Sequence, residues 1–541
     1  MTSGGGERIG ALPDDLLHHV LSFLPAHEAV RTCLLARRWL HLWKSAPALR
    51  VTGVKGCHNP AWFLKFVDNL LLNRDPRARL ESFELDLHER DFDFKEFLPA
   101  YERQVNLWFR HALMCGPRVL LALRTTNGIY EYPEDYETLG FSNVPIISQH
   151  LTKLELQRVY VRSSTLDFSG CPVLIHLKME DCDIKGNISS PFLKHLSIVE
   201  SFFQTDPFRG RICLPGLVSL ELTGELRRAP VLESMPLLVS AIVRLELGCH
   251  DSCSKNDYGD CDNSTCWRCH DPTTGSDDCL GESVLLKGLS EVSELELSVA
   301  SEVFIINRDL KLCPTFSKLK TLLLSEWCPD IASDLNVLSC FLKHSPILEK
   351  LTLQLSKVPK DPAEIQRSYT PPEQSFALSH LKSVEIRFDE VDAKVLNILS
   401  THGIPLEKVI IQRTKLLDLN FIVNRDLKLC PVFSNLKTLL LSERCPGIAS
   451  DLNVLSCFLK HSPIMEKLTL QLSKVPKVPV ETQRSYTLSE QSFQCAGLKI
   501  VEIKYEEFDG RAHKLLDILS SHGVPLEKVR FQRIINKPSG S

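Results

Sequence analysis

A group of cysteines and histidines in the middle of the chain could bind a metal ion. Cys266 and Cys269 are separated by two residues, and Cys249 and Cys253 lie upstream in a segment rich in Asp, Ser, Gly and Asn. The other potential ligands of this segment are His250, Cys261, His270 and Cys279. Four thiolates, or three thiolates and one imidazole, are ligand sets of structural zinc sites. Zinc binding would also supply free energy to order so polar a segment.

A loop without metal is the alternative interpretation of residues 249–280. The cysteine spacings are irregular, and no pair of C-x-x-C motifs frames the segment. A polar insertion between two repeats has the same composition. We therefore commit no metal ligand and keep Cys249, Cys253, Cys266 and Cys269 as candidates beside this alternative. Cysteines inside helix or strand patterns are predicted to be small buried hydrophobic residues, as at Cys33, Cys171, Cys340 and Cys457.

The sequence contains no motif typical of catalysis. A Gly-rich phosphate loop, a G-x-S-x-G turn and an H-E-x-x-H helix are all missing from it. The histidines of the predicted helices and repeated segments are interpreted as surface or hydrogen-bonding residues: His18, His19, His344, His402, His461 and His522. Three aromatic residues could line a ligand pocket, with core packing as the favoured alternative: Phe202, Phe203 and Phe208. We predict a non-enzymatic protein with no catalytic residue and no cofactor.

Composition limits the remaining classes of function. The chain has 541 residues, of which 43% are hydrophobic and 24% charged, so several domains or a repeat stack are expected. A net charge of -4 gives no electrostatic indication of nucleic-acid binding. No apolar run reaches membrane-spanning length, and the N-terminus lacks a secretory core. We expect a soluble protein of the cytoplasm or nucleus, with its 19 cysteines reduced.

Apolar residues near the N-terminus recur at helical spacing: Leu12, Leu16, Leu17, Val20, Leu21 and Leu24. They predict a helix over 12–24, with Pro13 in its first turn and Pro25 ending it. A second helix is predicted over 26–36 and a third over 37–44. Three helices in about forty residues are too few to bury all of this apolar surface, so part of it should face a partner.

The run LPDDLLHHVLSFLPAHEAVRTCLLARRWLHLWKSAPAL resembles the F-box. In that family the module docks onto the Skp-family adaptor of SCF (cullin-RING) ubiquitin ligases. The resemblance covers residues 9–51 and implies nine adaptor-binding residues: Leu12, Pro13, Leu16, Leu21, Leu24, Val30, Trp39, Leu42 and Trp43. It also implies that cullin joins through the adaptor.

Residues 52–150 alternate between helix and strand patterns, as a linker helix and an entry to a repeat stack would. Helices are predicted at 62–71 and 105–115, and strands at 80–87 and 119–123. From Leu151 the pattern L-x-x-L-x-(L/M/I) recurs, with starts at 151, 174, 193 and 217. The intervals of 23, 19 and 24 residues are close to the leucine-rich-repeat range of about 20–29. Further strands are predicted at 243–247, 292–297, 319–324, 348–353, 381–386 and 406–411.

The predicted fold is therefore α/β: a three-helix F-box followed by a leucine-rich-repeat (LRR) solenoid, which is a curved parallel sheet with helices and loops on the convex side. The repeats occupy 151–303, with the Cys-rich loop inserted at 249–280. Each strand would bury its leucines against its neighbours, so that the intervening residues remain for binding a ligand.

The C-terminal half contains a long duplication. The segment IASDLNVLSCFLKHSPI occurs at 331–347 and again at 448–464, an offset of 117 residues (448 − 331). The copies span 304–413 and 421–533, and 534–541 is predicted to be a disordered tail. Both copies resemble the FBD-type terminus of plant F-box proteins. The inner copy must either stack onto the second or leave a seam at 414–424.

Two interpretations of the duplication stay open: a recent tandem duplication or gene fusion, and a lengthened recognition surface. The resemblance as a whole implies a plant F-box/FBD/LRR substrate receptor, whose F-box binds the Skp-family adaptor and whose solenoid binds a target protein for ubiquitination. An interaction scaffold without ligase coupling is the alternative. A metal-dependent enzyme is a third class, which depends only on the Cys-rich loop. Nucleic acid and membrane are not expected as partners.

Overall fold

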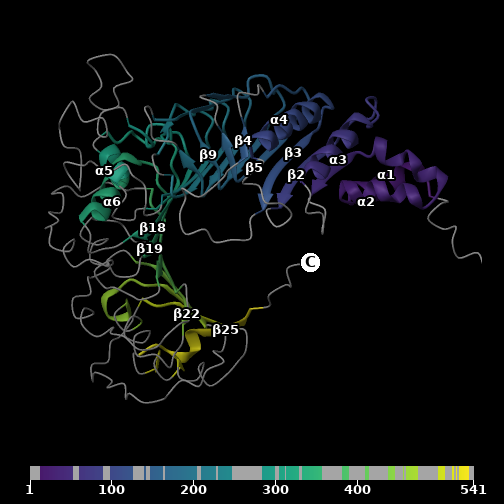
Figure 1. Cartoon of the computed structure of the whole chain (residues 1–541). Helices are drawn as coiled ribbons and strands as arrows, with labels where there is room; N and C mark the ends of the chain where they lie inside the picture. The colour runs from purple at the N-terminus through teal and green to yellow at the C-terminus, as the bar shows by residue number, and fades with distance from the viewer. Residues whose placement is uncertain are drawn as a thin grey trace, which may run out of the picture. The chain divides into compact units, whose positions relative to one another are not determined.

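The structure is a computed structural model of the chain (Figure 1). It describes residues 12–52, 60–88, 98–125, 139–141, 146–161, 165–203, 209–226, 229–245, 283–298, 304–310, 312–327, 332–355, 380–388, 408–413, 436–444, 455, 458–472, 497–505, 515–516, 519–520 and 523–534. The chain divides into two compact units. The first comprises residues 1–291 and 303–312, and the second comprises 292–302 and 313–541. Among the described helices, none is long and apolar enough to cross a lipid bilayer.

The N-terminal module begins with two α-helices, α1 (Asp14–Ser22) and α2 (Ala26–Arg31). Each is preceded by a proline at its N-cap, Pro13 with φ -56° and Pro25 with φ -55°. The fixed φ of proline is compatible with a helix start, and the missing N–H would have had no intrahelical partner there. Pro25 therefore begins the second helix, whereas the first already ends at Ser22.

The rest of the module is formed by short 3-10 helices. These are η1 (Thr32–Leu34), η2 (Arg37–Leu40) and η3 (Leu42–Ser45). The prediction of one regular third helix over 37–44 was therefore wrong, and the second α-helix ends at Arg31. Across these short 3-10 helices, which have three residues per turn, Trp39 joins the core with Leu17 and Leu21, and Trp43 packs against it.

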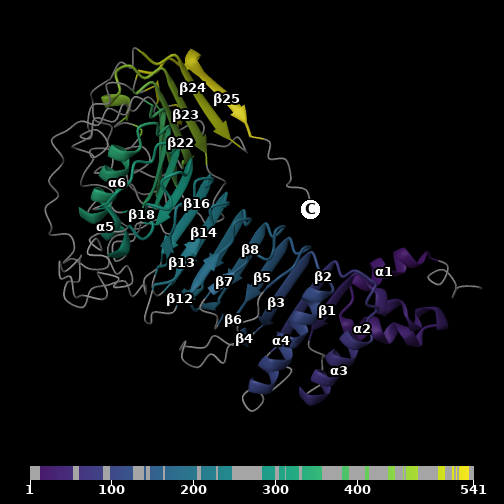
Figure 2. The ribbon, with the colours of Figure 1, turned by 90° about the horizontal axis from the view of Figure 1, so that it is seen from above.

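Three parallel strands and two helices follow the module: β1 (Ala48–Thr52), α3 (Pro60–Leu72), β2 (Ser82–His88), α4 (Leu98–Met114) and β3 (Val119–Thr125). The strands pair in the order β1-β2-β3. The helices pack together through Phe63 and Trp108, whose ring centroids are 6.2 Å apart, and Trp108 donates a hydrogen bond to Asp68 at 2.8 Å. Figure 2 shows both helices beside these strands. The predicted alternation of helix and strand is confirmed here.

The repeat strands of the first unit continue the same sheet. They are β5 (Lys153–Gln157), β8 (His176–Glu180), β11 (His195–Val199), β14 (Ser219–Gly224) and β16 (Ser240–Leu245). All of these strands are parallel. The second leucine of each predicted motif pairs with the second leucine of the neighbouring motif, in the order Leu154, Leu177, Leu196 and Leu220. These four side chains are at most 2% exposed. The leucine spacing therefore predicted these strands, and the structure pairs the equivalent leucines in register.

Short strands, and not helices, form the other layer of these repeats in the described part of residues 139–245. They make two four-stranded parallel sheets, ordered β15-β13-β10-β7 and β12-β9-β6-β4. Their ranges are β4 (Leu139–Phe141), β6 (Val159–Val161), β7 (Thr165–Asp167), β9 (Asp183–Ile184), β10 (Asn187–Ser189), β12 (Phe202–Phe203), β13 (Arg211–Cys213) and β15 (Val231–Leu232). Repeats of 19 to 24 residues leave room for an extended segment but for little helix.

One residue with a left-handed backbone stands at the end of the strand in successive repeats, directly after β5, β8 and β11 and as the last residue of β14. The positions are Arg158 (φ 55°), Asp181 (φ 52°), Glu200 (φ 47°) and Gly224 (φ 103°). Their separations of 23, 19 and 24 residues equal the repeat spacing. The backbone N–H group of each of the first three donates a hydrogen bond of 2.9 Å to a backbone carbonyl of the next repeat. The acceptors are the carbonyls of Glu180, Val199 and Thr223, in that order. These bonds help to offset the conformational cost of positive φ in residues other than glycine.

Helix α5 (Phe304–Leu310) closes the first unit after the Cys-rich segment. Its Asp309 is 1% exposed and accepts four hydrogen bonds from the turn at 283–286. The donors are Ser283 Oγ at 2.8 Å and the backbone N–H groups of Val284, Leu285 and Leu286 at 2.8, 2.6 and 2.9 Å. Because these N–H groups are buried, the carboxylate satisfies donors that water cannot reach.

The second unit contains a parallel sheet in chain order. Its strands are β17 (Glu294–Ser298), β18 (Thr321–Trp327), β19 (Lys350–Leu355), β20 (Ser383–Phe388), β21 (Lys408–Arg413), β22 (Thr438–Arg444), β23 (Lys467–Leu472), β24 (Ile500–Tyr505) and β25 (Val529–Arg533). Each pairs with the next. Helix α6 (Ala332–His344) connects β18 to β19, and the 3-10 helix η9 (Leu526–Lys528) precedes β25.

The two copies of the duplication stack without a break in strand pairing. The last strand of the first copy, β21, pairs with β22 of the second over Lys408–Gln412 and Thr438–Ser442. The register shift between Leu324 and Trp327 in the β18–β19 pair recurs between Leu441 and Arg444 in the β22–β23 pair. Of the two arrangements that the sequence allowed at the junction, stacking is therefore the one observed. Residues 414–424 themselves lie outside the described part.

Together these observations confirm the predicted α/β fold of a helical N-terminal module followed by leucine-rich-repeat parallel sheet. Strand ends differ from the prediction by a few residues, as at β16, which begins at Ser240. The proposed tail at 534–541 lies outside the described residues except for Ile534.

Candidate functional site

The inner face of the N-terminal module holds its helices together. Its core consists of buried residues from α1, α2, the 3-10 helices η2 and η3 and the residue that follows η3: Leu17, Leu21, Ala29, Trp39, Leu42 and Ala46. Leu12, Leu24 and Trp43 pack against this core while keeping part of their surface exposed. The core is thus assembled mainly by Leu17 and Leu21, one helical turn apart on α1, against the residues of η2 and η3.

The outer face of α1 is apolar but remains exposed. Leu16, Val20 and Phe23 lie at positions i, i+4 and i+7, and their exposed fractions are 49%, 46% and 60%. Exposed leucines of the neighbouring turns have fractions of 85%, 70% and 48%, at Leu34, Leu35 and Leu40. Such a concentration of apolar side chains in one small module marks an interaction surface more often than chance exposure. We name Leu16, Val20 and Phe23 the α1 stripe.

The structure separates the nine predicted adaptor-binding residues into three groups. Leu21, Trp39 and Leu42 are only 1%, 5% and 9% exposed, so in this structure they support the helices and have almost no surface for a partner. The partly exposed group is Leu12, Leu24, Val30 and Trp43, and the exposed group is Pro13 and Leu16. Contact with a partner remains a prediction for all nine.

The sequence-based choice missed part of the exposed apolar surface. Val20 and Phe23 continue the helical spacing from Leu16, yet Leu17 and Leu21 follow the same spacing one residue later. Periodicity alone cannot distinguish two adjacent apolar stripes on one helix, because both repeat every three or four residues. Their separation into core and surface depends on where η2 and η3 pack.

The module is fixed to the beginning of the sheet. Pro25 forms an isolated parallel bridge with Arg50 of β1. The backbone N–H of Asp75 donates to the carbonyl of Lys44 at 3.0 Å, and Glu81 donates to Pro47 at 2.6 Å. These contacts lie within the first unit, so the α1 stripe has a defined position relative to the first strands. A protein bound there would be held at a defined place beside the sheet.

The sheet face opposite the leucine core carries polar side chains in the first unit. Lys153, His176 and His195 lie in register on β5, β8 and β11. The His176 and His195 rings stack with centroids 4.5 Å apart. Burial, followed by the neighbouring His195 and Lys153, lowers the pKa of His176, which favours its neutral form. A face of mixed charges and imidazoles is suited to a polar protein surface.

The corresponding face of the second unit carries ion pairs that recur between the two copies. Lys350 lies 2.8 Å from Glu385, and its counterpart Lys467 lies 2.8 Å from Glu502. The exposed pair of Lys382 and Glu349 recurs as Lys499 and Glu466. Because the strands of each copy pair in the same register, the duplication has repeated this charge pattern along the sheet.

The remaining candidate residues have mixed outcomes. Cys249, Cys253, Cys266 and Cys269 lie outside the described residues, as do their neighbours His250, Cys261, His270 and Cys279. Cys171 is buried as predicted, whereas Cys33 and Cys340 are half-buried. Phe203 is 1% exposed and packs in the core, and Phe202 is half-buried. The remaining predictions on Phe208, His402, Cys457 and His522 fall outside the described part.

His18, His19, His344 and His461 lie within described helical segments. His19 is exposed and makes an edge contact with Phe23, with ring centroids 4.9 Å apart. The His344 imidazole hydrogen-bonds within its own helix, to the carbonyl of Cys340 at 2.9 Å. None of these contacts requires a catalytic role.

The chain is similar to known proteins both in its N-terminal module and over longer stretches. Residues 9–50 match the F-box domain model. An F-box/LRR-repeat protein of Arabidopsis thaliana is 31% identical over 253 residues, which cover 40% of this chain and 53% of the relative. The meiotic F-box protein MOF of Oryza sativa subsp. japonica is 27% identical, with coverage of 70% and 80%. An F-box/FBD/LRR-repeat protein of Arabidopsis thaliana is 27% identical, with coverage of 71% and 86%.

The N-terminal module is therefore an F-box domain, and leucine-rich repeats follow it in the chain. These findings support the classification of the chain with the plant F-box/FBD/LRR proteins. They support an SCF substrate-adaptor role in general.

Proposed function

We propose that this chain is the substrate-recognition subunit of an SCF-type E3 ubiquitin ligase, and that its F-box binds a Skp-family adaptor through the α1 stripe. The observation that carries the proposal is the exposure of Leu16, Val20 and Phe23 beside a packed core. These side chains are about half exposed, so burying the remainder against an apolar groove would contribute about 1 kcal/mol per residue, roughly half the value for full burial. This is the helix-in-groove mode of recognition, with anchors at i, i+4 and i+7.

The proposed mechanism is proximity, without a catalytic residue in this chain. The adaptor would connect the F-box to cullin, while the exposed face of the repeat sheet holds a target protein. Holding both partners on one chain raises the effective concentration of target lysines near the ubiquitin-loaded enzyme. The mixed charges and stacked imidazoles of that face support a protein as its ligand. The cytoplasm or nucleus is the proposed compartment.

Co-precipitation of a Skp-family adaptor with the full chain tests the adaptor contact. We expect the double variant Leu16→Asp/Val20→Asp to lower adaptor recovery at least about tenfold, because two carboxylates would be buried at the contact. The matched control is Val173→Asp/Ile175→Asp, whose residues are each 40% exposed but lie at the turn before β8. This control should bind normally.

The same experiment distinguishes the ligase subunit from an interaction scaffold. If the unmodified chain recovers no adaptor while its thermal unfolding remains cooperative, the ligase proposal is wrong and the scaffold alternative stands. If both double variants bind normally, the adaptor does not use the α1 stripe. Replacing Leu12 and Pro13 by alanine tests the entry to α1 in the same assay.

A further inference from the structure

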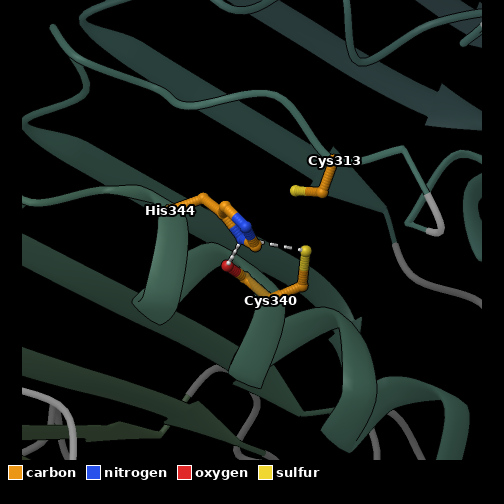
Figure 3. Close-up of side chains that lie close together, drawn as sticks. All are labelled: Cys313, Cys340 and His344. Carbon is orange, nitrogen blue, oxygen red and sulfur yellow. Dashed lines mark hydrogen bonds between the residues drawn. The ribbon is translucent and has the colours of Figure 1, made fainter.

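Three potential metal ligands converge in the second unit. Cys313 lies in the segment before β18, and Cys340 and His344 lie one turn apart near the end of α6. Their ligand atoms all lie within 4.8 Å of one another, and Cys340 Sγ is 3.5 Å from His344 Nδ1. Figure 3 shows both sulfurs beside the imidazole. All three residues are half-buried. The sequence interpretation did not bring them together.

The dimensions of the cluster suit a zinc ion. Zinc bonds of about 2.3 Å to sulfur and 2.0–2.1 Å to nitrogen in a tetrahedron place the ligand atoms about 3.5–3.8 Å apart. The His344 ring already approaches Cys340 Sγ to 3.5 Å at its Nδ1 atom. One ring nitrogen and both sulfurs lie within 4.8 Å of one another, so small side-chain rotations would suffice to bring the three ligand atoms to the zinc spacing.

The backbone around the cluster is positioned without a metal. Phe316 donates its backbone N–H to the carbonyl of His344 at 2.8 Å. The Phe316 and Phe341 rings lie 4.9 Å apart, and both side chains are 0% exposed. The segment that carries Cys313 is therefore already packed on the turn of α6 that carries the other two ligands. A preformed site lowers the conformational cost of binding.

The chemistry of the side chains also favours a metal. The hydrogen bond with Cys313, together with nearby His344 and Lys343, lowers the pKa of Cys340 to about 7, despite the opposing effect of burial. Thiolate is the form of cysteine that binds metal. The carbonyl of Cys340 can only accept, so the 2.9 Å contact shows that Nδ1 of His344 carries a proton in this structure. In neutral imidazole, Nε2 then keeps its lone pair and is the ring nitrogen that can bind a metal.

We propose that Cys313, Cys340 and His344 bind a Zn²⁺ ion, with the fourth coordination position taken by water or an external donor. Two thiolates and one imidazole form a soft, borderline ligand set that selects zinc over magnesium or calcium. Bound zinc would fasten the segment before β18 to the end of α6 and so stabilise the crossover between β18 and β19. The proposal is independent of adaptor binding, since the F-box belongs to the other unit.

Zinc stoichiometry of the full chain tests the proposal. The same three residue types recur 117 positions later, at Cys430, Cys457 and His461. The measurements therefore use a Cys430→Ser/Cys457→Ser background, so that only the first set of ligands is varied. The protein is kept reduced, stripped with a chelator, incubated with Zn²⁺ alone and analysed for bound metal after removal of excess.

We expect the further substitution Cys313→Ser/Cys340→Ser to lower bound zinc by one equivalent per chain. The matched control Cys213→Ser removes an exposed thiol of β13 and should leave the zinc content unchanged. Taking the difference between variants removes any contribution from the Cys-rich segment. With Co²⁺ in place of Zn²⁺, the thiolate-to-cobalt absorption should be reduced by the same double substitution and retained in Cys213→Ser.

A second readout does not depend on the folding of the variants. In the background protein, Zn²⁺ should slow alkylation of Cys340, measured by peptide mass spectrometry, at least tenfold at pH 7. Equal zinc content with and without Cys313 and Cys340 would overturn the proposal. So would unchanged alkylation of Cys340 on zinc addition, or a Cys313–Cys340 disulfide that persists in reductant.

Discussion

Arg38 donates two hydrogen bonds to one carboxylate oxygen of Asp14, from Nη2 at 2.6 Å and from Nε at 3.0 Å. This ion pair joins η2 to the first turn of α1 across 24 residues of sequence. Its side chains are 38% and 59% exposed, so solvent screens the attraction, and surface pairs of this kind contribute roughly 0–1 kcal/mol. The pair therefore orients the two helices, while the buried leucines supply most of the stability of the F-box.

We predict that Leu17→Ala destabilises the F-box by about 2–5 kcal/mol, because it removes a fully buried side chain and leaves a cavity. Leu16→Ala, on the exposed side of the same helix, should change stability by only about 0.5 kcal/mol. Urea denaturation measures both. Equal losses for the two variants would contradict the division of α1 into a core face and an exposed stripe.

Gly224→Ala should destabilise the first unit by about 1–3 kcal/mol, because φ is 103° at this position. The added Cβ would also lie 2.7 Å from Glu200 Oε2 and 2.8 Å from Glu200 Cα. The control is Gly170→Ala, where the nearest atom is Cγ1 of Ile147, an exposed side chain, and φ is not left-handed. The urea midpoint should fall for Gly224→Ala alone. A fall of the same size in both would refute the backbone explanation.

Asp309→Ala should lower the stability of the first unit by at least about 3 kcal/mol, since it leaves three buried backbone N–H groups without an acceptor. Asp309→Asn keeps the side-chain volume and one carbonyl oxygen, so we expect a smaller loss. The thermal midpoint of each variant gives the comparison. If alanine and asparagine are equally harmless, the carboxylate does not hold α5 to the turn at 283–286.

The second unit should lose stability in acid, because the ionised carboxylate of Glu385 stabilises it. Burial raises the pKa of its carboxyl, but the hydrogen bonds from Lys350 and Arg387 outweigh this effect, and the net pKa lies below the ordinary value of 4.5. Because the folded-state pKa is the lower one, the stabilisation is complete above about pH 4.5 and is lost as the pH falls through the folded value. Thermal midpoints measured from pH 7 to pH 3 report this loss.

Glu385→Gln should be less stable at pH 7 and should lose part of this acid dependence. In the second copy, the hydrogen bond from Lys467 likewise lowers the pKa of Glu502. Glu502→Gln should therefore act in the same sense. The double variant Glu385→Gln/Glu502→Gln should lose more of the acid dependence than either single variant. If its thermal midpoint depends on pH as in the unmodified chain, the role of these pairs is contradicted.

Deletion of residues 331–447 should give a folded chain that still binds the adaptor. The deletion removes one period of 117 residues (448 − 331), so β18 is followed by a crossover that differs from its own only in having Met465 in place of Leu348, and then by β23. Since the β18–β19 and β22–β23 pairs share the same register and irregularity, β18 can pair with β23. Size-exclusion chromatography and far-UV circular dichroism should show a monodisperse chain with retained secondary structure.

Deletion of residues 331–435 is the matched control. It leaves only a few residues between β18 and β22, whereas parallel strands need a crossover of about a dozen or more. This chain should aggregate or lose cooperative unfolding. If it folds as well as the period deletion, the second unit tolerates arbitrary loss and the stacking of the copies does not organise it.

Much of the repeat architecture could be predicted from the sequence, because its signal is local. Leu154, Leu177, Leu196 and Leu220 repeat at one spacing, and each must be buried by its equivalents, so strand position and register follow together. The F-box was recognisable for the same reason, since its apolar spacing and its prolines lie within one short segment. Local periodicity could not show that Leu17 is in the core and Leu16 is exposed.

The sequence by itself determined that this chain has an N-terminal F-box, parallel repeat strands and a duplicated C-terminal half. Only the tertiary structure decided which face of α1 is exposed, that β21 continues into β22, and that Asp309 caps the turn at 283–286. It also brought Cys313 to Cys340 and His344. The physical reason is that each of these contacts joins residues separated in the chain. Packing of whole elements determines such distances, and a local pattern contains no information about them.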